Sequence, residues 1–309
     1  MKNETSIKYF YLLSFSGETR SKPFITAFFF LIYVVGVLIN SSIITVICLE
    51  VQLHKPMYLF IGNLSIVDIL FTSVTIPKLL HMILSGNHIV SFLQCYTQLY
   101  CYVTVGTAEE TLLFVMAYDR YVAICNPLHY PLILNSRNCS LMTIGIWAAA
   151  LLNSLLFVTS VLHLSSCHSN IIHQFFCDAK SLTQITCSTT QQFLIVNSVE
   201  MLLFAFIPLT GTFTSYFKIF SVIFKMKIKE NQKKAFSTCS SHVTVISIFY
   251  VSCISSYLNP HYSEVLDSVF TIIYTTIVPM VNPIIYSLQN SNVKTAMLGS
   301  VKGKCFRKR

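Results

Sequence analysis

The chain has 309 residues, of which 54% are hydrophobic and only 11% are charged, and its formal net charge is +9. A soluble globular domain has roughly a quarter of its residues charged, so this apolar excess is too large to bury in one soluble core. The composition therefore predicts a protein that crosses a membrane several times. The positive charge does not require a nucleic-acid partner, because basic residues also collect on cytoplasmic loops beside anionic lipid headgroups.

The first 23 residues are polar and mixed, and they lack the pattern of a cleaved signal peptide. They contain Asn3 in the tripeptide Asn-Glu-Thr, an acceptor pattern for N-glycosylation. The same pattern recurs at Asn40, Asn63 and Asn138, but these residues lie in or beside apolar runs, where glycosylation is implausible. We therefore expect residues 1–23 to form an exposed tail with Asn3 as its glycosylation site.

Seven apolar segments follow, at residues 24–49, 57–80, 98–124, 141–162, 193–224, 235–258 and 269–288. Each reaches the ~20 residues that a helix needs to cross the hydrocarbon core, and open strands are excluded because lipid would leave their edges unpaired. Prolines at positions 77, 208, 279 and 283 interrupt these segments, and we expect neighbouring helices or water to satisfy the freed carbonyls. The predicted fold is an all-α seven-transmembrane helix bundle over residues 24–288, in a single domain of residues 1–309.

The distribution of lysine and arginine predicts the orientation. The loops and ends on the N-terminal side of the membrane carry six of these residues and the opposite side carries fifteen, together the 21 in the chain. The positive-inside rule then puts the N-terminus outside the cell and the C-terminus in the cytoplasm. On the cytoplasmic side, residues 225–234 form a basic run that suits anionic membrane lipid or an acidic partner. Residues 289–309 alternate basic and apolar side chains, which predicts a cytoplasmic tail with a short amphipathic helix.

Four cysteines are predicted to face the outside. Cys167, Cys177 and Cys187 lie in the longest outer loop, and Cys95 lies at the outer start of the third segment. An even number of cysteines in an oxidising compartment favours two disulfides, for which three pairings are possible. Histidines in the same loop leave a metal site open as an alternative.

The third segment ends in MAYDRYVAIC, residues 116–125, which places Asp119 and Arg120 side by side. Ionisable residues at membrane depth are costly and are functional candidates for that reason. Side chains spaced alternately by three and four residues share one face of a helix, and such a face runs the length of this segment. It contains Tyr102, Gly106, Glu109, Leu113, Met116 and Arg120. We expect this face to point into the bundle.

Asp68, in the second segment, and Glu109 are predicted to lie at similar depth on adjacent helices. Two ionised carboxylates there would repel each other, so either one is protonated or a cation lies between them. Hard cations such as sodium favour oxygen ligands, and Ser65 and Asn282 offer further oxygens. Apart from this possible sodium ion, we expect no cofactor.

Enzyme and transporter functions are disfavoured. The chain contains no HExxH, GxSxG or phosphate-binding glycine loop, and Asp68 and Asp119 lie at different depths, unlike the paired aspartates of an intramembrane protease. The seven segments do not show the internal repeats typical of transporters.

The chain resembles rhodopsin-like G-protein-coupled receptors, and specifically olfactory receptors, over nearly its whole length. The resemblance rests on five motifs in order: LHKPMYLFIGNLSIVDIL at 53–70, MAYDRYVAICNPLHYP at 116–131, SYFKI at 215–219, KAFSTCSSHV at 234–243 and PMVNPIIYSLQN at 279–290. Gln289 departs from the basic residue usual in the last motif, and Leu59 departs from the usual aromatic pair in the first.

The resemblance implies roles for particular residues. It pairs Cys95 with Cys177 and Cys167 with Cys187, and it makes Asp68 and Glu109 an allosteric sodium site. It assigns the G-protein switch to Asp119, Arg120, Tyr121, Tyr216, Asn282, Pro283 and Tyr286. It implies a ligand pocket lined by Tyr102, Val103, Gly106, Thr107, Glu200, Phe204, Tyr250, Cys253, Ile254, Tyr257 and Thr275.

The resemblance also implies a function at the plasma membrane. A small volatile odorant would bind in the outer half of the bundle, and the receptor would activate the stimulatory olfactory G protein and raise cyclic AMP. The carboxylate of Glu200 is unusual in a pocket suited to apolar volatiles, which leaves open a hydrogen-bonded acid or an ionised group that selects amines. A ligand-gated channel, a transporter and a receptor for a water-soluble ligand remain alternatives.

Overall fold

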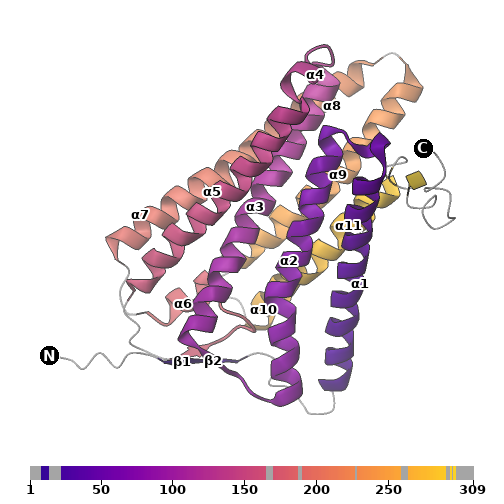
Figure 1. Cartoon of the computed structure of the whole chain (residues 1–309). Coiled ribbons are helices and arrows are strands. Elements are labelled where there is room, and N and C mark those ends of the chain that lie inside the picture. The colour runs from indigo at the N-terminus through magenta and orange to yellow at the C-terminus, as the bar shows by residue number, and fades with distance from the viewer. Residues whose placement is uncertain are drawn as a thin grey trace.

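The structure is a computed structural model that describes residues 8–13, 22–164, 170–186, 190–226, 228–258, 264–289, 293 and 295–296. The described part contains seven long helical rods packed as a bundle (Figure 1). The rods are α1 (Lys22–Leu49), α2 (Pro56–Ser85), α3 (Phe92–Cys125), α5 (Ser136–Leu162), α7 (Gln191–Glu200) continued by η2 (Met201–Phe206) and α8 (Ile207–Lys225), α9 (Lys229–Leu258), and α10 (Glu264–Ile272) continued by η3 (Ile273–Ile277) and α11 (Val278–Gln289). The prediction of an all-α seven-helix bundle is confirmed.

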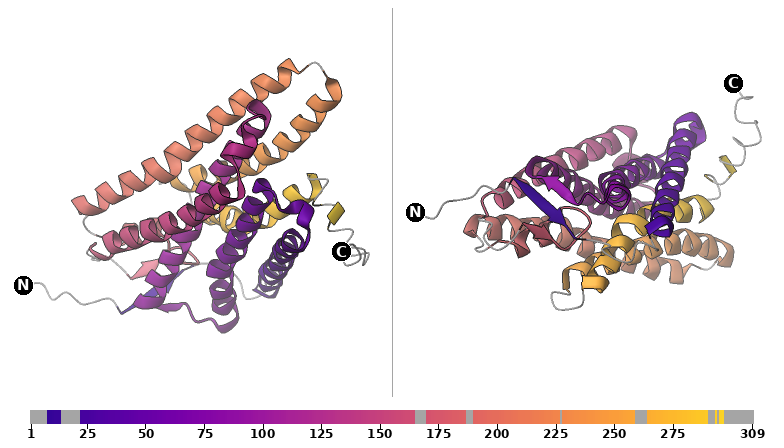
Figure 2. Two further views of the ribbon diagram at one scale, coloured as in Figure 1. Left: turned by 45° about the horizontal axis from the view of Figure 1, so that its top comes forward. Right: turned by 90° about the horizontal axis from the view of Figure 1, so that it is seen from below.

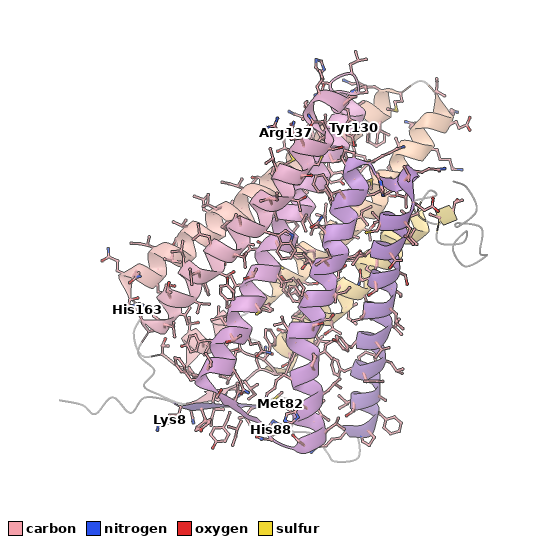
Figure 3. All side chains as sticks on the ribbon, in the orientation of Figure 1. Lys8, Met82, His88, Tyr130, Arg137 and His163 are labelled. Atoms are coloured by element: carbon pink, nitrogen blue, oxygen red, sulfur yellow. A yellow bond between two sulfur atoms is a disulfide. The ribbon has the colours of Figure 1, made fainter. Side chains whose placement is uncertain are left out.

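Short elements close the two ends of the bundle. One end carries the 3-10 turn η1 (Val51–Leu53) and helix α4 (Tyr130–Ile133). The other end carries helix α6 (Ala179–Gln184) and the strands β1 (Tyr9–Leu12), β2 (Ile89–Ser91) and β3 (Ile171–Ile172). Figure 3 shows Tyr130 and Arg137 at the first end, and Lys8 and His88 at the second.

By length and apolar composition alone, α1, α2, α5 and the rod of residues 191–225 qualify as membrane-spanning helices within the described residues. Helix α3 is as long as these but carries Glu109, Glu110, Asp119 and Arg120. It lies in the middle of the bundle, in contact with α2, α5, α8 and α9 (Figure 1). A helix in this position can keep its charged side chains away from lipid.

The predicted segments lie within the observed rods, but several rods are longer. Helix α3 begins at Phe92 rather than residue 98 because Ser91 caps it. The Ser91 hydroxyl accepts a hydrogen bond from the Gln94 amide at 3.2 Å, and the Gln94 side-chain oxygen accepts one from the Ser91 amide at 3.1 Å. This reciprocal capping box satisfies two donors at the helix start and moves the boundary outward.

The prediction that residues 1–23 form only an exposed tail is wrong in part. Residues 9–12 form the central strand of a three-stranded sheet, and helix α1 already begins at Lys22. Strand β1 pairs antiparallel with β2, with Phe10 opposite Val90, and parallel with β3, with Leu12 opposite Ile172. Asn3, and with it the glycosylation prediction, lies outside the described residues.

The sheet lies across the ends of the helices, as the end-on view in Figure 2 shows. The alternation of strand β1 buries Phe10 and Leu12 and exposes Tyr9 and Tyr11. Phe10 belongs to the cluster of buried residues at this end of the bundle, and its ring stacks on that of the 40% exposed Phe92 with centroids 6.3 Å apart. The N-terminal segment therefore contributes to the outer core of the bundle.

Two of the predicted proline interruptions coincide with π-helical turns. Pro208 follows η2 and Pro279 follows η3, in each case two residues after the π segment ends. Proline lacks an amide donor and its ring crowds the carbonyl one turn back, and a π turn accommodates this local mismatch without ending the helix. Pro77 and Pro283, by contrast, lie inside α2 and α11.

The tail prediction is largely untested. Of residues 290–309 the structure describes Val293, Thr295 and Ala296, which have helical backbone, and Val293 is buried. The remaining residues of the expected amphipathic helix lie outside the described residues.

Phe10→Ala should destabilise the receptor, because the ring is 1% exposed and anchors strand β1 over the outer core. Truncation of a buried phenylalanine costs about 3 kcal/mol. The matched control is Tyr9→Ala, whose side chain is 54% exposed and whose removal should change stability by less than about 0.5 kcal/mol. Thermal unfolding of the receptor in nanodiscs measures both, and equal effects would show that the strand adds nothing to the core.

Candidate functional site

The predicted face of α3 lies inside the bundle. Glu109, Leu113 and Met116 are each at most 1% exposed, and an added Cβ on Gly106 would lie 3.5 Å from the Tyr274 hydroxyl of the last rod. The ends of the face are partly exposed, at Tyr102 and Gly106 on the outer side and at Arg120, whose side chain is 17% exposed, on the inner side. The face therefore connects an outer aromatic region with a charged inner end.

The inner end is organised around the carboxylate of Asp119, which is fully buried. One carboxylate oxygen accepts hydrogen bonds from Arg120 Nη2 at 2.5 Å and Nε at 2.8 Å. The other accepts the Tyr130 hydroxyl at 2.9 Å. Burial and the neighbouring Asp119 charge raise the pKa of Tyr130, so it remains a neutral donor. Both oxygens are therefore satisfied, as a buried carboxylate requires.

Tyr130 is a functional candidate that sequence reasoning missed. It lies in the short helix α4, eleven positions beyond Asp119 along the chain, so no helical spacing connects the two. Tyr130 belongs to the motif MAYDRYVAICNPLHYP, but the sequence does not show that the fold brings its hydroxyl to the Asp119 carboxylate.

Next to this pair, Tyr216 of α8 forms a short hydrogen bond with His242 of α9. Both side chains are buried, at 7% and 1% exposed. His242 was also missed, although it lies within KAFSTCSSHV. Three hydroxyl residues of the same motif, at positions 237, 238 and 241, have side chains outside the described ones. In this conformation Tyr216 therefore connects α8 to α9.

The other predicted switch residues lie in separate parts of the bundle. The ring of Tyr121 lies 5.4 Å from Lys218 Nζ of α8. Asn282 and Pro283 are buried in α11. The side chain of Tyr286 lies outside the described ones.

The centre of the bundle contains the two predicted carboxylates. Asn282 Nδ2 donates to Asp68 Oδ1 at 3.1 Å and to Glu109 Oε1 at 3.5 Å. All three side chains are 1% exposed. One amide therefore joins α2, α3 and α11.

The composition of this centre fits either a proton or a monovalent cation. Two buried carboxylates share one neutral donor, so the charge of at least one needs compensation. In the described part of the chain, no cluster of three His, Cys, Asp or Glu side chains suited to a metal ion occurs. A hard cation at this place would take its oxygen ligands from Asp68, Glu109 and neighbouring amide or hydroxyl groups.

The outer half contains a second polar group. Asn153 of α5 donates to Thr107 Oγ1 at 3.1 Å and to Glu200 Oε1 at 3.4 Å. Asn153 and Thr107 are buried, and Glu200 lies where α7 passes into the π turn η2. Asn153 was not predicted as a site residue, although an amide side chain within the apolar segment 141–162 could have indicated one. Glu200 is therefore turned toward α3 and α5.

Aromatic rings form a contact chain across the outer half. From the outer loop to α9, neighbouring centroids are 4.9, 5.3, 5.1, 5.5 and 5.2 Å apart along Phe176, Tyr102, Phe71, Tyr274, Phe249 and Tyr250. At the α9 end the buried Tyr250 hydroxyl has no hydrogen-bond partner among the described residues. Of these six aromatic residues, only Tyr102 and Tyr250 were predicted from the sequence.

The remaining predicted pocket residues divide into three groups. Thr275 is fully buried and donates to the Thr271 carbonyl at 2.8 Å, and Val103 packs in the outer core. Phe204 and Cys253 are partly buried. The side chains of Ile254 and Tyr257 lie outside the described ones.

A disulfide covers the outer half. Cys95 and Cys177 are bonded, as predicted, and both are fully buried. The Cys177 amide also donates to Gln98 Oε1 at 3.0 Å. Cys167 and Cys187 lie outside the described residues, so their pairing stays a prediction.

The seven-helix fold matches that of a rhodopsin. The crystal structure of squid rhodopsin superimposes with a TM-score of 0.73, covering 95% of this chain and 91% of the rhodopsin at 15% identity. The chain therefore has the fold of a rhodopsin, with a buried ion pair at one end of the bundle and a disulfide at the other.

Sequence comparison identifies the family. The olfactory receptor profile matches residues 29–303. The dog olfactory receptor-like protein OLF4 is 41% identical, covering 98% of this chain and 99% of that protein. Human olfactory receptor 5F1 is 40% identical, covering 98% and 97%. The chain belongs to the olfactory receptor family. It is therefore a multi-pass plasma-membrane receptor for a small molecule, coupled to a G protein, and not an enzyme.

Tyr130→Phe should raise basal signalling. It removes the donor to one Asp119 oxygen and leaves the ring in place, and hydrogen bonds to charged groups contribute roughly 1.5–3 kcal/mol. If the bond forms mainly in the resting state, G-protein output without ligand should rise about tenfold. The control Tyr100→Phe removes a 3.4 Å hydrogen bond at the outer end of α3 and should leave G-protein output without ligand unchanged. Unaltered basal output of Tyr130→Phe would exclude this role.

Proposed function

We propose that the protein is an odorant receptor that binds a small volatile ligand in the outer half of the bundle. The observation that carries the proposal is the buried Tyr250 hydroxyl, which lacks a hydrogen-bond partner among the described residues. An unsatisfied buried hydroxyl is costly, and a bound polar group can remove that cost. The aromatic chain that ends at this tyrosine supplies apolar contact area for such a ligand.

Polar groups around this region are few, which suits small-molecule recognition. Ligand sites are mostly apolar with a small number of placed polar groups that fix orientation. Thr107, Asn153 and Glu200 form one hydrogen-bonded set, and Tyr250 supplies another polar group. A volatile with one polar end and an apolar body would match this distribution.

We further propose that the receptor activates the stimulatory olfactory G protein and raises cyclic AMP. The resting arrangement would keep Arg120 on Asp119 and Tyr216 on His242. Activation requires both contacts to be exchanged if Tyr216 is to reach Arg120. A ligand can shift this equilibrium only by its differential affinity for the two arrangements.

The orientation proposed is N-terminus outside and C-terminus in the cytoplasm. It follows from the distribution of the 21 lysine and arginine residues, most of which lie on the side of Arg137 and the basic run 225–234. The ion pair then lies at the cytoplasmic boundary, where a G protein can reach it, and the disulfide lies in an oxidising compartment.

We also propose that the central pair of Asp68 and Glu109 holds a sodium ion or a shared proton. The support is that one Asn282 amide serves both carboxylates, which leaves negative charge to compensate. Because α2, α3 and α11 meet there, occupancy would favour the arrangement in which these helices stay together.

Arg120→Ala tests the switch. Receptor display at the cell surface should stay near wild type, because the guanidinium lies at the end of the bundle, whereas cyclic AMP responses to an active odorant should be abolished. Arg137→Ala removes an exposed arginine at the same end and serves as the control. Retained cyclic AMP responses in Arg120→Ala would refute the assignment.

Glu200→Gln tests whether this carboxylate selects amine ligands. The amide keeps a hydrogen-bonding group near Asn153 but removes the charge. If Glu200 pairs with an ammonium group, potency of amines should fall about tenfold or more relative to neutral odorants, because a charge-assisted hydrogen bond is lost. Glu230→Gln, which removes an exposed carboxylate in the first turn of α9, is the control. An unchanged ratio of amine to neutral potency in a ligand panel would leave Glu200 as a structural acid.

A further inference from the structure

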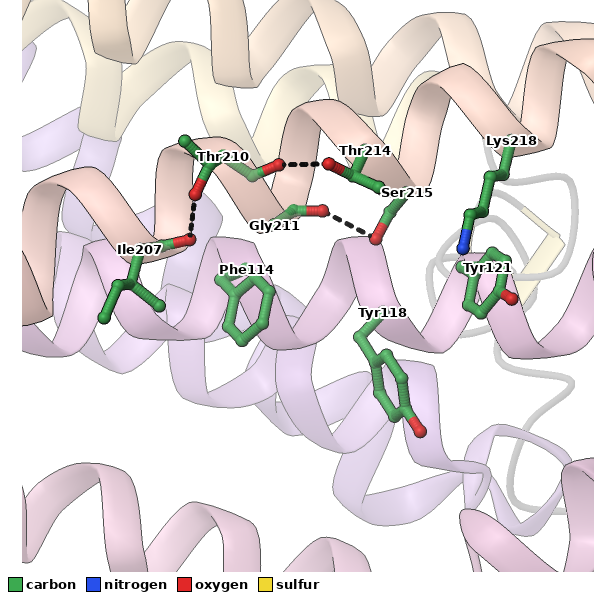
Figure 4. Close-up of a pocket in the computed structure, with 9 residues that line it drawn as sticks. All are labelled: Phe114, Tyr118, Tyr121, Ile207, Thr210, Gly211, Thr214, Ser215 and Lys218. Carbon is green, nitrogen blue, oxygen red and sulfur yellow. Dashed lines mark hydrogen bonds between the residues drawn. The ribbon is translucent and has the colours of Figure 1, made fainter.

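A groove of about 390 Å³ lies between α3 and α8 (Figure 4). Phe114, Tyr118 and Tyr121 of α3 form one wall, and residues of α8 from Ile207 to Lys218 form the other. Tyr118 is nine positions beyond Glu109, which is a half-turn around the helix axis of about 180°. The α3–α8 groove therefore lies off the face of α3 that carries Glu109, and between Phe114 and Tyr121 it is nearer the inner end of that helix than the pocket residue Thr107.

The hydroxyl groups along the α8 wall are already used. Thr210 donates to the Phe206 carbonyl, Thr214 to the Thr210 carbonyl and Ser215 to the Gly211 carbonyl, each at 2.8 Å. Such bonds to the preceding helical turn leave these side chains without a free donor. Between its ends, the groove therefore presents a wall suited to a hydrocarbon chain.

One end of the groove is cationic. Lys218 Nζ lies 5.4 Å from the centre of the Tyr121 ring, a cation–π distance. Lys218 forms no ion pair with a carboxylate of the described residues. This ammonium group is exposed and available to an anion.

The length of the groove matches one leaflet of a membrane. From Ile207 to Lys218 the helix rises by about 16 Å. The hydrocarbon core of a bilayer is roughly 30 Å thick, so the groove spans about half of it. Lys218 then lies at headgroup level when Ile207 lies near the midplane.

The groove opens toward lipid rather than water. Phe213 and Phe217, on the same helix as its α8 wall, are 74% and 68% exposed, and Ile207 at the deep end is 48% exposed. Exposed aromatic and aliphatic side chains beside a groove are tolerated where acyl chains surround them.

We propose that the α3–α8 groove binds one acyl chain of an anionic phospholipid from the cytoplasmic leaflet, with its headgroup on Lys218. Charge complementarity favours this occupant, because the lysine-rich side of the protein faces the leaflet in which anionic lipid is enriched. The exposed Lys225, Lys229 and Lys233 at the same end strengthen that attraction. The bound chain contacts Tyr118 and Tyr121, the two residues that flank the Asp119–Arg120 pair.

Gly211 allows the groove to be narrowed by design. An added Cβ at this position would lie 2.4 Å from Phe114 Cε2, so the ring has to shift. Phe114 lines the groove, and Gly211→Ala therefore obstructs the acyl site without changing any charge. Lys218→Gln does the reverse, because it removes the charge and leaves the groove open.

The test uses the full-length receptor in nanodiscs with photoactivatable phosphatidylserine, which carries a diazirine on one acyl chain. Phosphatidylcholine with the same chain and a free photoactivatable fatty acid are compared with it. Cross-linked peptides that contain residues 114–121 or 207–218 are quantified by mass spectrometry. Phosphatidylserine should label these peptides about fivefold more than phosphatidylcholine, the effect of one lysine near an anionic headgroup.

The variants separate the two parts of the site. Lys218→Gln should reduce phosphatidylserine labelling to the phosphatidylcholine level, whereas Lys225→Gln should reduce it much less. Gly211→Ala should reduce labelling by both phospholipids severalfold. If Gly211→Ala does not fold, Ile207→Trp fills the deep end from a half-exposed position and replaces it.

Three results would overturn the proposal. Equal labelling by the two phospholipids would show that Lys218 does not select an anionic headgroup. Labelling by the fatty acid alone would identify a free amphiphile as the occupant. Labelling spread evenly over the exposed face, with Phe213 modified as strongly as the groove residues, would show ordinary annular lipid.

Discussion

The fold depends on one constraint, which is that charged side chains in a membrane-spanning chain must find partners inside the protein. Helix α3 contains most of these charged side chains, and this explains why α3 lies at the centre of the bundle. Glu109 reaches Asn282, and Asp119 reaches Arg120 and Tyr130. The contact with Asn282 connects α3 to α11 and the contact with Tyr130 connects it to α4, so the same groups that would be costly in lipid help to fix the arrangement of the bundle.

The features that the sequence predicted well are those encoded locally. Seven apolar runs determine seven helices, since each run is long enough to span and contains its own backbone hydrogen bonds. The buried face of α3 followed from helical spacing alone. The bond between Cys95 and Cys177 came from resemblance to a family, because spacing left three pairings open.

The features that the sequence did not predict depend on contacts between distant segments. Tyr130, His242 and Asn153 acquire their roles only when α4, α9 and α5 pack beside α3 or α8. Strand β1 is four residues long and gains its stability from pairing with two loops, so its alternation of buried and exposed side chains was too short to indicate a strand. The π turns before Pro208 and Pro279 likewise reflect local adjustment that no hydrophobic pattern records.

The two faces of α3 also have different tolerances. On the inner face, Glu109 and Asp119 depend on fixed hydrogen-bond partners, so a change in one residue leaves another buried group unsatisfied. On the outer face, Phe114 packs against Gly211 of α8, and Phe114 and Tyr118 line a groove between the two helices. Close packing at the glycine and open space beside it therefore occur along the same contact between α3 and α8. A lipid chain can therefore adapt to the outer face, whereas the inner face admits only groups that satisfy its hydrogen bonds.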